Sequence, residues 1–297
     1  MENARVEKRK ITPRQRTQQR APQKPETREE KMTAALSPDL NVMVRAVRKA
    51  GSRIVRDFGE VSSLQVSMKG PGDFVSNADT FAEKTLIDIL REDRPDCGIL
   101  SEECGSLPGA ADCPYQFIID PIDGTMNFLH AVPSFALSVG LMKGDEIIAG
   151  VIYNPISNEL YYAEKGKGAF VMLAGGTKRL RVSGRRQLSH CLIGTNGFSF
   201  PKTRQIMEKM TNEVASIRIN GCSTLSLAFV AGGQFDAYVS ARFQLWDIAV
   251  GYLLIREAGG SVADLHGNTS LSDIQKSQTL IATNHVLQDG LKKIIGV

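Results

Sequence analysis

The sequence predicts a layered α/β protein whose body is built from two halves. From about residue 135 to residue 173, short apolar runs alternate with turns, as expected for neighbouring antiparallel strands. After Gly184, segments with helical spacing alternate with short apolar runs, which indicates helices packed on a sheet. With 297 residues, 42% of them hydrophobic, the chain can form one large domain or two closely packed halves.

Helices are expected where apolar residues recur at three- and four-residue spacing. In the first such segment Val44 and Val47 share a face, and Gly59 marks its end. Pro95 follows the second segment and Gly259 follows the fifth, as expected of residues that stop helices. The ranges with this spacing are 40–58, 78–91, 202–215, 223–231, 248–258 and 288–295.

Strands are expected in short apolar runs that are bounded by turn residues. A turn at Lys143-Gly144-Asp145 joins two of these runs, and the pair Gly175-Gly176 closes the antiparallel group. The ranges are 117–119, 135–141, 147–153, 160–163, 169–172, 237–240 and 280–282. The change from neighbouring strands to alternating elements places the boundary between the two halves near residue 184.

The N-terminal segment, residues 1–36, is predicted to be a disordered basic extension. Residues 1–31 contain ten Lys or Arg and five Glu, a net charge of +5, whereas the rest of the chain is close to neutral. The segment has too few aliphatic side chains to bury a core, and it lacks the apolar stretch of a secretory signal. A basic arm can contact nucleic acid. The alternative is a passive extension, or a true start at Met32.

Cysteine and histidine spacing argues against a disulfide framework and against zinc. The five cysteines include no Cys-x-x-Cys pair, and the four histidines are scattered along the chain. This usage fits reduced thiols in a cytoplasmic protein. No apolar run approaches the ~20 residues that a membrane-spanning helix needs.

The most informative stretch is Asp120-Pro121-Ile122-Asp123-Gly124-Thr125. It follows the apolar run at 117–119, so its two carboxylates stand where a buried strand opens into a glycine turn. Paired carboxylates suit Mg²⁺, which also shares phosphate oxygens. If a helix begins at Gly124-Thr125, the amides there can bind a phosphate. The alternative is an ordinary turn, since Asp-Gly is common turn chemistry.

Three other segments occur in a fixed order around this stretch. They are residues 72–79, whose sequence is Gly-Asp-Phe-Val-Ser-Asn-Ala-Asp, then Ser101-Glu102-Glu103, and finally Leu245-Trp246-Asp247. With residues 120–125 they resemble the pattern of the inositol monophosphatase family, and the resemblance runs from about Leu40 to the C-terminus. It implies a catalytic domain over residues 37–297 with the sugar-phosphatase fold, in which helix and sheet layers alternate (αβαβα).

The resemblance also implies a metal-dependent phosphatase, with Mg²⁺ as the cofactor. Glu102 and Asp120, with the carbonyl of Ile122, are the expected ligands of the first ion. Asp120, Asp123 and Asp247 are the expected ligands of the second ion, so Asp120 bridges the two. A third, weaker ion position on Glu102 and water is also implied.

The resemblance assigns the attack on phosphorus to a water molecule that Thr125 and Glu102 orient. Asp79 is expected to accept a hydrogen bond from the Thr125 hydroxyl. The alternative for Asp79 is a simple cap on a helix starting near Thr80. The residues expected to contact the substrate are Asp123, Gly124, Thr125, Gly221, Cys222, Ser223 and Asp247.

The leaving-group side departs from the family pattern at Ser240. The family usually carries a glutamate seven residues before the metal aspartate, where it grips the inositol ring. A serine loses a charge-assisted hydrogen bond, typically about 1.5–3 kcal/mol, which leaves the preferred substrate open. Arg242 nearby would favour a more anionic substrate.

Inositol 1-phosphate is the default substrate that the resemblance implies, together with inhibition by lithium and a homodimer. Three related activities stay open: fructose-bisphosphatase, histidinol-phosphate phosphatase and 3′-phosphoadenosine 5′-phosphate phosphatase. A different class of role is also open, because some bacterial relatives assist transcription antitermination or ribosome assembly through RNA polymerase. The basic extension suits RNA contact in such a role.

Overall fold

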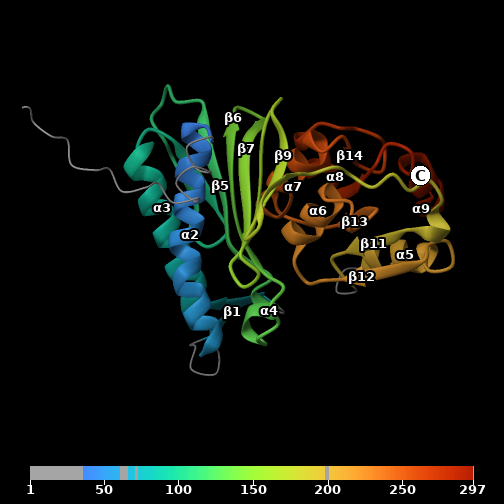
Figure 1. Cartoon of the computed structure of the whole chain (residues 1–297), viewed down its shortest axis with the longest axis horizontal. Coiled ribbons are helices and arrows are strands. Elements are labelled where there is room, and N and C mark those ends of the chain that lie inside the picture. The colour runs from blue at the N-terminus through green and yellow to red at the C-terminus, as the bar shows by residue number, and fades with distance from the viewer. Residues whose placement is uncertain (1–35, 61–65, 71–72, 198–200, 297) are drawn as a thin grey trace, which may run out of the picture. The chain divides into compact units, whose positions relative to one another are not determined.

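Helices and sheets alternate in layers through the part of the chain that the structure describes (Figure 1). This computed structural model describes residues 36–60, 66–70, 73–197 and 201–296. The predicted basic extension lies outside these ranges except for Leu36, so its disorder stays a prediction. Gly72, the first residue of the segment 72–79, also lies outside them.

The larger sheet has eight strands in the order β10-β9-β8-β7-β6-β5-β3-β4. Its strands are β3 (Gly98–Ser101), β4 (Gly105–Leu107), β5 (Tyr115–Asp123), β6 (Ala136–Lys143), β7 (Glu146–Asn154), β8 (Glu159–Glu164), β9 (Gly168–Leu173) and β10 (Gly176–Arg179). All neighbours are antiparallel except β3 and β5, which are parallel. The parallel pair matters for the site, because both strands then end at the same edge of the sheet.

The smaller sheet has five strands in the order β12-β11-β13-β15-β14. Its strands are β11 (Leu192–Thr195), β12 (Ser216–Ile219), β13 (Ala237–Ala241), β14 (Ser261–Ala263) and β15 (Thr279–Thr283). Strand β11 is parallel to both of its neighbours, and β15 is antiparallel to both of its own. A separate two-stranded hairpin pairs β1 (Val66–Gly70) with β2 (Asp73–Ser76).

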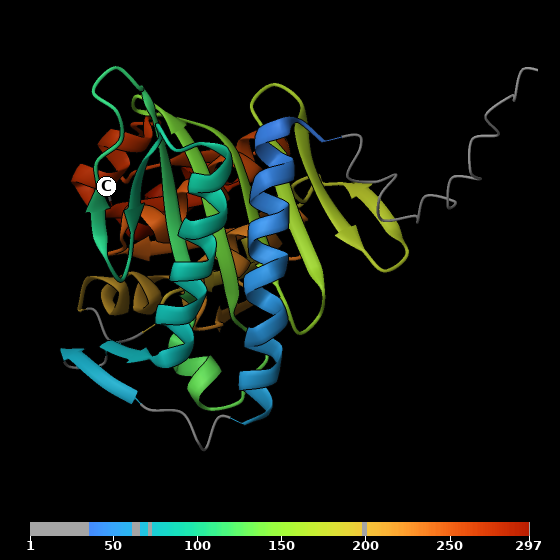
Figure 2. The same ribbon diagram turned by 90° about the vertical axis from the view of Figure 1, so that its left-hand side faces the viewer.

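Two long helices cover the outer face of the larger sheet (Figure 2). They are α2 (Pro38–Gly59) and α3 (Asn77–Asp93), and they lie side by side. Ser37 caps α2 by accepting from the amide of Leu40, and Pro38 occupies the first turn, where a missing N–H costs nothing. The buried stripe of α2 includes Val44 and Val47, as the spacing predicts.

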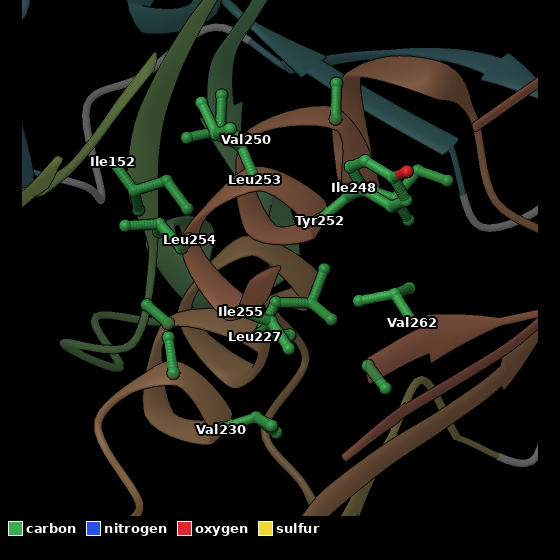
Figure 3. Close-up of a cluster of buried hydrophobic side chains, with 14 of the residues drawn as sticks. Ile152, Leu227, Val230, Ile248, Val250, Tyr252, Leu253, Leu254, Ile255 and Val262 are labelled. Atoms are coloured by element: carbon green, nitrogen blue, oxygen red, sulfur yellow. The ribbon is translucent and has the colours of Figure 1, made fainter. Parts of the chain in front are cut away.

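Helices α6 (Ser223–Ala231) and α7 (Leu245–Glu257) lie between the two sheets. Both are apolar on nearly all sides, as expected of a helix with protein on both faces. Figure 3 shows Val250 and Leu254 of α7 facing Ile152 of β7. Gly150 permits this approach, because a Cβ there would lie 2.8 Å from Val250.

The outer face of the smaller sheet is covered by α5 (Pro201–Met210) and α9 (Gln288–Ile295). The shorter helices are α4 (Thr125–Leu129) and α8 (Leu271–Ser277), with a 3-10 turn at Leu188–His190. The layer order is therefore αβαβα, which confirms the predicted fold class. None of the helices in the described ranges combines the length and apolarity required to cross a bilayer.

One predicted helix is too long. Residues 202–215 have helical spacing, but α5 ends at Met210 and the chain then turns. The amides of Ala215 and Ser216 donate to the carbonyl of Cys191, at 3.1 and 3.3 Å, and lead the chain into β12. The expected helix is wrong at its end because strand pairing satisfies these amides instead. The short strands β3, β4, β10, β11, β12 and β14, the hairpin and α8 were not predicted.

The larger sheet uses strands up to Arg179, and the smaller sheet uses strands from Leu192 onward. Helix α7 of the later segment nevertheless packs on both sheets. The division into halves near residue 184 stays a prediction.

Candidate active site

Four carboxylates from three parts of the chain converge at one edge of the larger sheet. Glu102 follows β3, Asp120 and Asp123 belong to β5, and Asp247 lies in the first turn of α7. A cavity of about 400 Å³ opens over them. It is lined by Glu102, Asp123, Thr195, Asn196, Gly221, Cys222, Ser223, Tyr238, Arg242, Phe243, Gln244, Trp246 and Asp247.

Asp120 is the buried member of this cluster. It is 1% exposed, and its Oδ1 atom has no hydrogen-bond partner among the described residues. Burial raises the pKa of Asp120 well above its usual range, and the charges of Glu102, Asp123 and Asp247 raise it further. A buried carboxylate among three others is stable only with a proton or a cation. The donor set of hard carboxylate oxygens therefore fits Mg²⁺ or a similar ion.

Two of the carboxylates are held at helix starts. The Oδ2 atom of Asp247 accepts from the amide of Gln244 at 2.7 Å, which closes a capping box on α7. The Oδ2 atom of Asp123 accepts from the amide of Thr224 at 2.6 Å, in the first turn of α6. Burial and the charge of Asp123 raise the pKa of Asp247 to about 7. Burial also raises the pKa of Asp123, although the donors from α6 oppose that shift.

The turn after β5 forms as predicted, and a helix begins directly behind it. Gly124 is left-handed, with φ of 93°, and α4 starts at Thr125. The Thr125 hydroxyl lies 3.0 Å from the Ile122 carbonyl oxygen and 3.4 Å from Asp79 Oδ1. The Thr125 hydroxyl can therefore donate either to the Ile122 carbonyl or to the Asp79 carboxylate.

Asp79 is 1% exposed and lies inside the first turn of α3, which begins at Asn77. The alternative interpretation, a cap on a helix starting near Thr80, is therefore wrong. The helix starts three residues earlier, so Asp79 is a helical residue whose side chain reaches Thr125.

Two further residues support the site, and the sequence analysis missed the first of them, Glu83. Glu83 is buried on α3, and its Oε1 atom accepts from the hydroxyl of Ser101 and from the amides of Glu103 and Cys104 at 3.1 and 3.0 Å. These three residues flank Glu102, so Glu83 fixes the turn that carries it. The signal was present: Glu83 stands among the apolar positions of an amphipathic helix.

Asn127 is the second supporting residue. Its side-chain nitrogen donates to the carbonyl of Ser134 at 2.6 Å and to that of Asn220 at 2.7 Å. The contact joins α4 to the loop before α6. Gly221 in that loop is left-handed, with φ of 69°, and a Cβ there would lie 2.9 Å from Asn127.

The far side of the cavity carries hydroxyl groups. The hydroxyls of Ser223 and Tyr238 lie 2.9 Å apart, and both residues line the cavity, as do Gly221 and Cys222. Ser240 is buried on β13, two residues from Tyr238 and on the same face of the strand. Arg242 lines the cavity with a left-handed backbone, φ 76°.

All five cysteines are free thiols. The sulfur atoms of Cys97 and Cys113 and a carboxylate oxygen of Asp96 lie within 4.8 Å of one another. The spacing of these cysteines in the sequence did not predict this group. The Arg94 guanidinium lies 3.9 Å from Asp96 and disfavours a cation there.

Comparisons with known proteins identify the family. A model of the inositol monophosphatase family matches residues 35–295. The inositol-1-monophosphatase of Mesorhizobium japonicum is 44% identical, over 88% of this chain and 97% of that protein. The Nus factor SuhB of Pasteurella multocida is 36% identical, over 87% of this chain and 96% of that protein. The crystal structure of the extragenic suppressor protein suhB from Bartonella henselae superposes with a TM-score of 0.82 at 44% identity, covering 88% of this chain and 99% of that chain.

These likenesses extend over the whole described body and both sheets. Enzymes of the matching family are generally metal-dependent, as the buried carboxylate cluster requires. The chain therefore belongs to the inositol monophosphatase family and is a phosphatase.

Proposed function

We propose that the protein is a Mg²⁺-dependent phosphomonoesterase that hydrolyses inositol 1-phosphate or a related polyol phosphate to the alcohol and inorganic phosphate. The observation that carries this proposal is the convergence of three other carboxylates around Asp120, whose Oδ1 atom is buried and has no donor among the described residues. The inositol-1-monophosphatase relatives support the choice of substrate.

Two metal positions belong to this proposal. Glu102 and Asp120, with the Ile122 carbonyl, would hold one ion, and Asp120, Asp123 and Asp247 the other. A third ion position on Glu102 and water belongs to the same proposal. Bound ions in such sites neutralise phosphoryl oxygens, activate a water molecule and stabilise the leaving oxygen.

The residues around the ions orient the reactants. Thr125 and Glu102 would orient the attacking water and help to take up its proton, while the Thr125 hydroxyl would donate a hydrogen bond to Asp79, which lies 3.4 Å away. The amides of Gly124 and Thr125 stand at the start of α4 and would donate to the phosphate. No Cβ stands at Gly124, so the backbone can approach the phosphate closely.

The leaving alcohol would lie toward Gly221, Cys222 and Ser223, with Asp123 and Asp247 contacting a hydroxyl beside the ions. Ser240 replaces the carboxylate that the family usually provides, and Arg242 lines the same cavity. A guanidinium favours an anionic group on the substrate. This keeps fructose 1,6-bisphosphate, histidinol phosphate and 3′-phosphoadenosine 5′-phosphate as alternative substrates.

The test is phosphate release from these four substrates with and without Mg²⁺. We expect Mg²⁺-dependent turnover that Asp247→Asn abolishes, while Asp112→Asn, at an exposed site, leaves it unchanged. A folded, metal-loaded protein that turns over none of them contradicts the proposal. Ser240→Glu should shift preference toward inositol 1-phosphate if the serine sets the specificity.

Three further properties belong to the proposal. Lithium would inhibit by taking the metal position at Asp123 and Asp247. The chain would act as a homodimer, and it would work in the cytoplasm, which fits its five free thiols.

A role in transcription is the second candidate, and the Nus factor relatives are the observation that favours it. The basic residues at 1–31 would contact RNA beside the RNA polymerase machinery. Deleting residues 1–31 should then weaken RNA binding and flatten its salt dependence, since phosphate contacts release counterions. An unchanged affinity at every salt concentration would exclude the extension from RNA binding.

A further inference from the structure

The start of α6 concentrates hydrogen-bond donors on one oxygen of Asp123. The Oδ2 atom lies 2.6 Å from the amide of Thr224, 2.7 Å from the Thr224 hydroxyl and 3.1 Å from the Cys222 sulfur. Cys222 and Thr224 are both buried, and their side chains lie 3.5 Å apart. These residues stand about a hundred positions after Asp123 and come from the layer between the sheets.

Part of this contact is an ordinary helix cap. The first amides of a helix have no intrahelical acceptor, and Cys222, the N-cap of α6, provides none from its side chain. Asp123 accepts the Thr224 amide in its place, with the charge favoured by the helix dipole. The hydroxyl of Thr224 and the thiol of Cys222 are not needed for this cap. In Thr224→Val the amide of residue 224 would still donate to Asp123.

We propose that Thr224, assisted by Cys222, is a positioning residue that fixes the Asp123 carboxylate for metal binding. With Oδ2 held from three sides, the rotation of the carboxylate is set, and so is the direction of Oδ1 toward the ion position shared with Asp120 and Asp247. The inference rests on the proposed function for the identity of that position. The side chains of Thr224 and Cys222 would thus orient a metal ligand without coordinating the ion themselves.

The test compares three variants at these positions. Thr224→Val removes the hydroxyl and keeps the volume and the amide. It should weaken metal binding about 10–100-fold, the loss that is typical when a residue that orients a metal ligand is mutated. Thr224→Ser keeps the donor and should recover most of that loss. Cys222→Ala should have a smaller effect, because a thiol is a weak donor.

The readout is Mn²⁺ alone, titrated into the full-length protein and followed by electron paramagnetic resonance, with thermal unfolding as a check of folding. Ser226→Ala is the matched control, since this buried hydroxyl on the same helix donates to the Cys222 carbonyl at 2.7 Å and not to a carboxylate. We expect weaker Mn²⁺ binding in Thr224→Val and unchanged binding in Ser226→Ala.

Equal Mn²⁺ affinity in Thr224→Val and the unmodified protein would overturn the proposal, whatever the phosphatase activity. So would a loss in Thr224→Val that Thr224→Ser shares in full. If the unmodified protein hydrolyses no phosphate ester but binds Mn²⁺ in a Thr224-dependent way, the positioning role stands and the proposed function fails. The same set of variants therefore tests the positioning role of Thr224 separately from the proposed phosphatase function.

Discussion

The side-chain nitrogen of Asn127 lies 2.7 Å from the carbonyl oxygen of Asn220, a residue 93 positions later in the chain. The same nitrogen also donates to Ser134 at 2.6 Å. One amide group thus ties the turn behind β5 to the loop that opens α6, and it holds the two sides of the cavity together.

Replacing Asn127 tests this tie. Asn127→Ala removes one side-chain donor from two carbonyls of half-buried residues, and the net loss of a hydrogen bond typically costs about 0.5–1.5 kcal/mol. We expect a lower thermal midpoint and a lower kcat/KM for phosphate release. Asn212→Ala, at an exposed position, is the control. An unaltered midpoint in Asn127→Ala would show that the contact contributes nothing to stability.

Gly124 is a second test of the same junction. Its φ of 93° is strained for any other residue, and a Cβ would lie 3.1 Å from the carbonyl oxygens of Gly221 and Ser134. Gly124→Ala should cost about 1–3 kcal/mol in the free energy of unfolding, measured in urea. Gly144→Ala is the control, because it shares the positive φ but has no atom within 4 Å of the added carbon. If both substitutions cost the same, strain alone accounts for the effect.

Glu83 should control the position of Glu102 without touching a substrate. Glu83→Ala leaves the amides of Glu103 and Cys104 without their acceptor. We expect metal affinity to fall about 10-fold or more, as for other groups that orient ligands. Isothermal titration with Mn²⁺ measures this. Glu92→Ala, exposed on the same helix, should bind normally, and normal binding by Glu83→Ala would contradict the role.

The carboxylate cluster predicts how stability depends on pH. In the metal-free protein, burial raises the pKa of Asp120 and Asp247, the latter from 3.8 to about 7. A carboxyl group whose pKa is higher in the folded state than in the unfolded state stabilises the folded state through its bound proton. This stabilisation is complete at pH values below the pKa in the unfolded state, near 3.8. That contribution disappears as the pH rises through about 7.

The metal-free protein should therefore lose thermal stability as the pH rises from about 4 to about 7, and Mg²⁺ should raise the midpoint more at the higher pH. Differential scanning calorimetry with and without a chelator measures both effects. A larger effect of Mg²⁺ at the lower pH would contradict the assignment of the raised pKa values to the metal site.

Part of the site was predictable because its chemistry is local, whereas the roles of Glu102 and Asp247 were expected only from the family resemblance. The two aspartates and the glycine of residues 120–125 lie within one turn, so their proximity follows from chain geometry. Periodicity also placed α6 and α9 at their observed bounds. The end of α5 was missed, because the pairing of Ala215 and Ser216 with Cys191 depends on a strand that local spacing does not reveal. Thr224 and Glu83 were missed for the same reason: each acts on a residue far away in sequence.

The sequence by itself determined the alternating elements, the carboxylates and the glycine turn, since these depend on neighbours within a few residues. Only the tertiary structure decided which carboxylate oxygens accept hydrogen bonds from the protein and which remain available to an ion. It buried Asp120 without a donor on Oδ1, and it brought the amide and hydroxyl of Thr224, in a distant helix, onto Asp123. The physical reason is that burial and hydrogen-bond pairing arise from packing between layers, and no local pattern records which layer a side chain will meet.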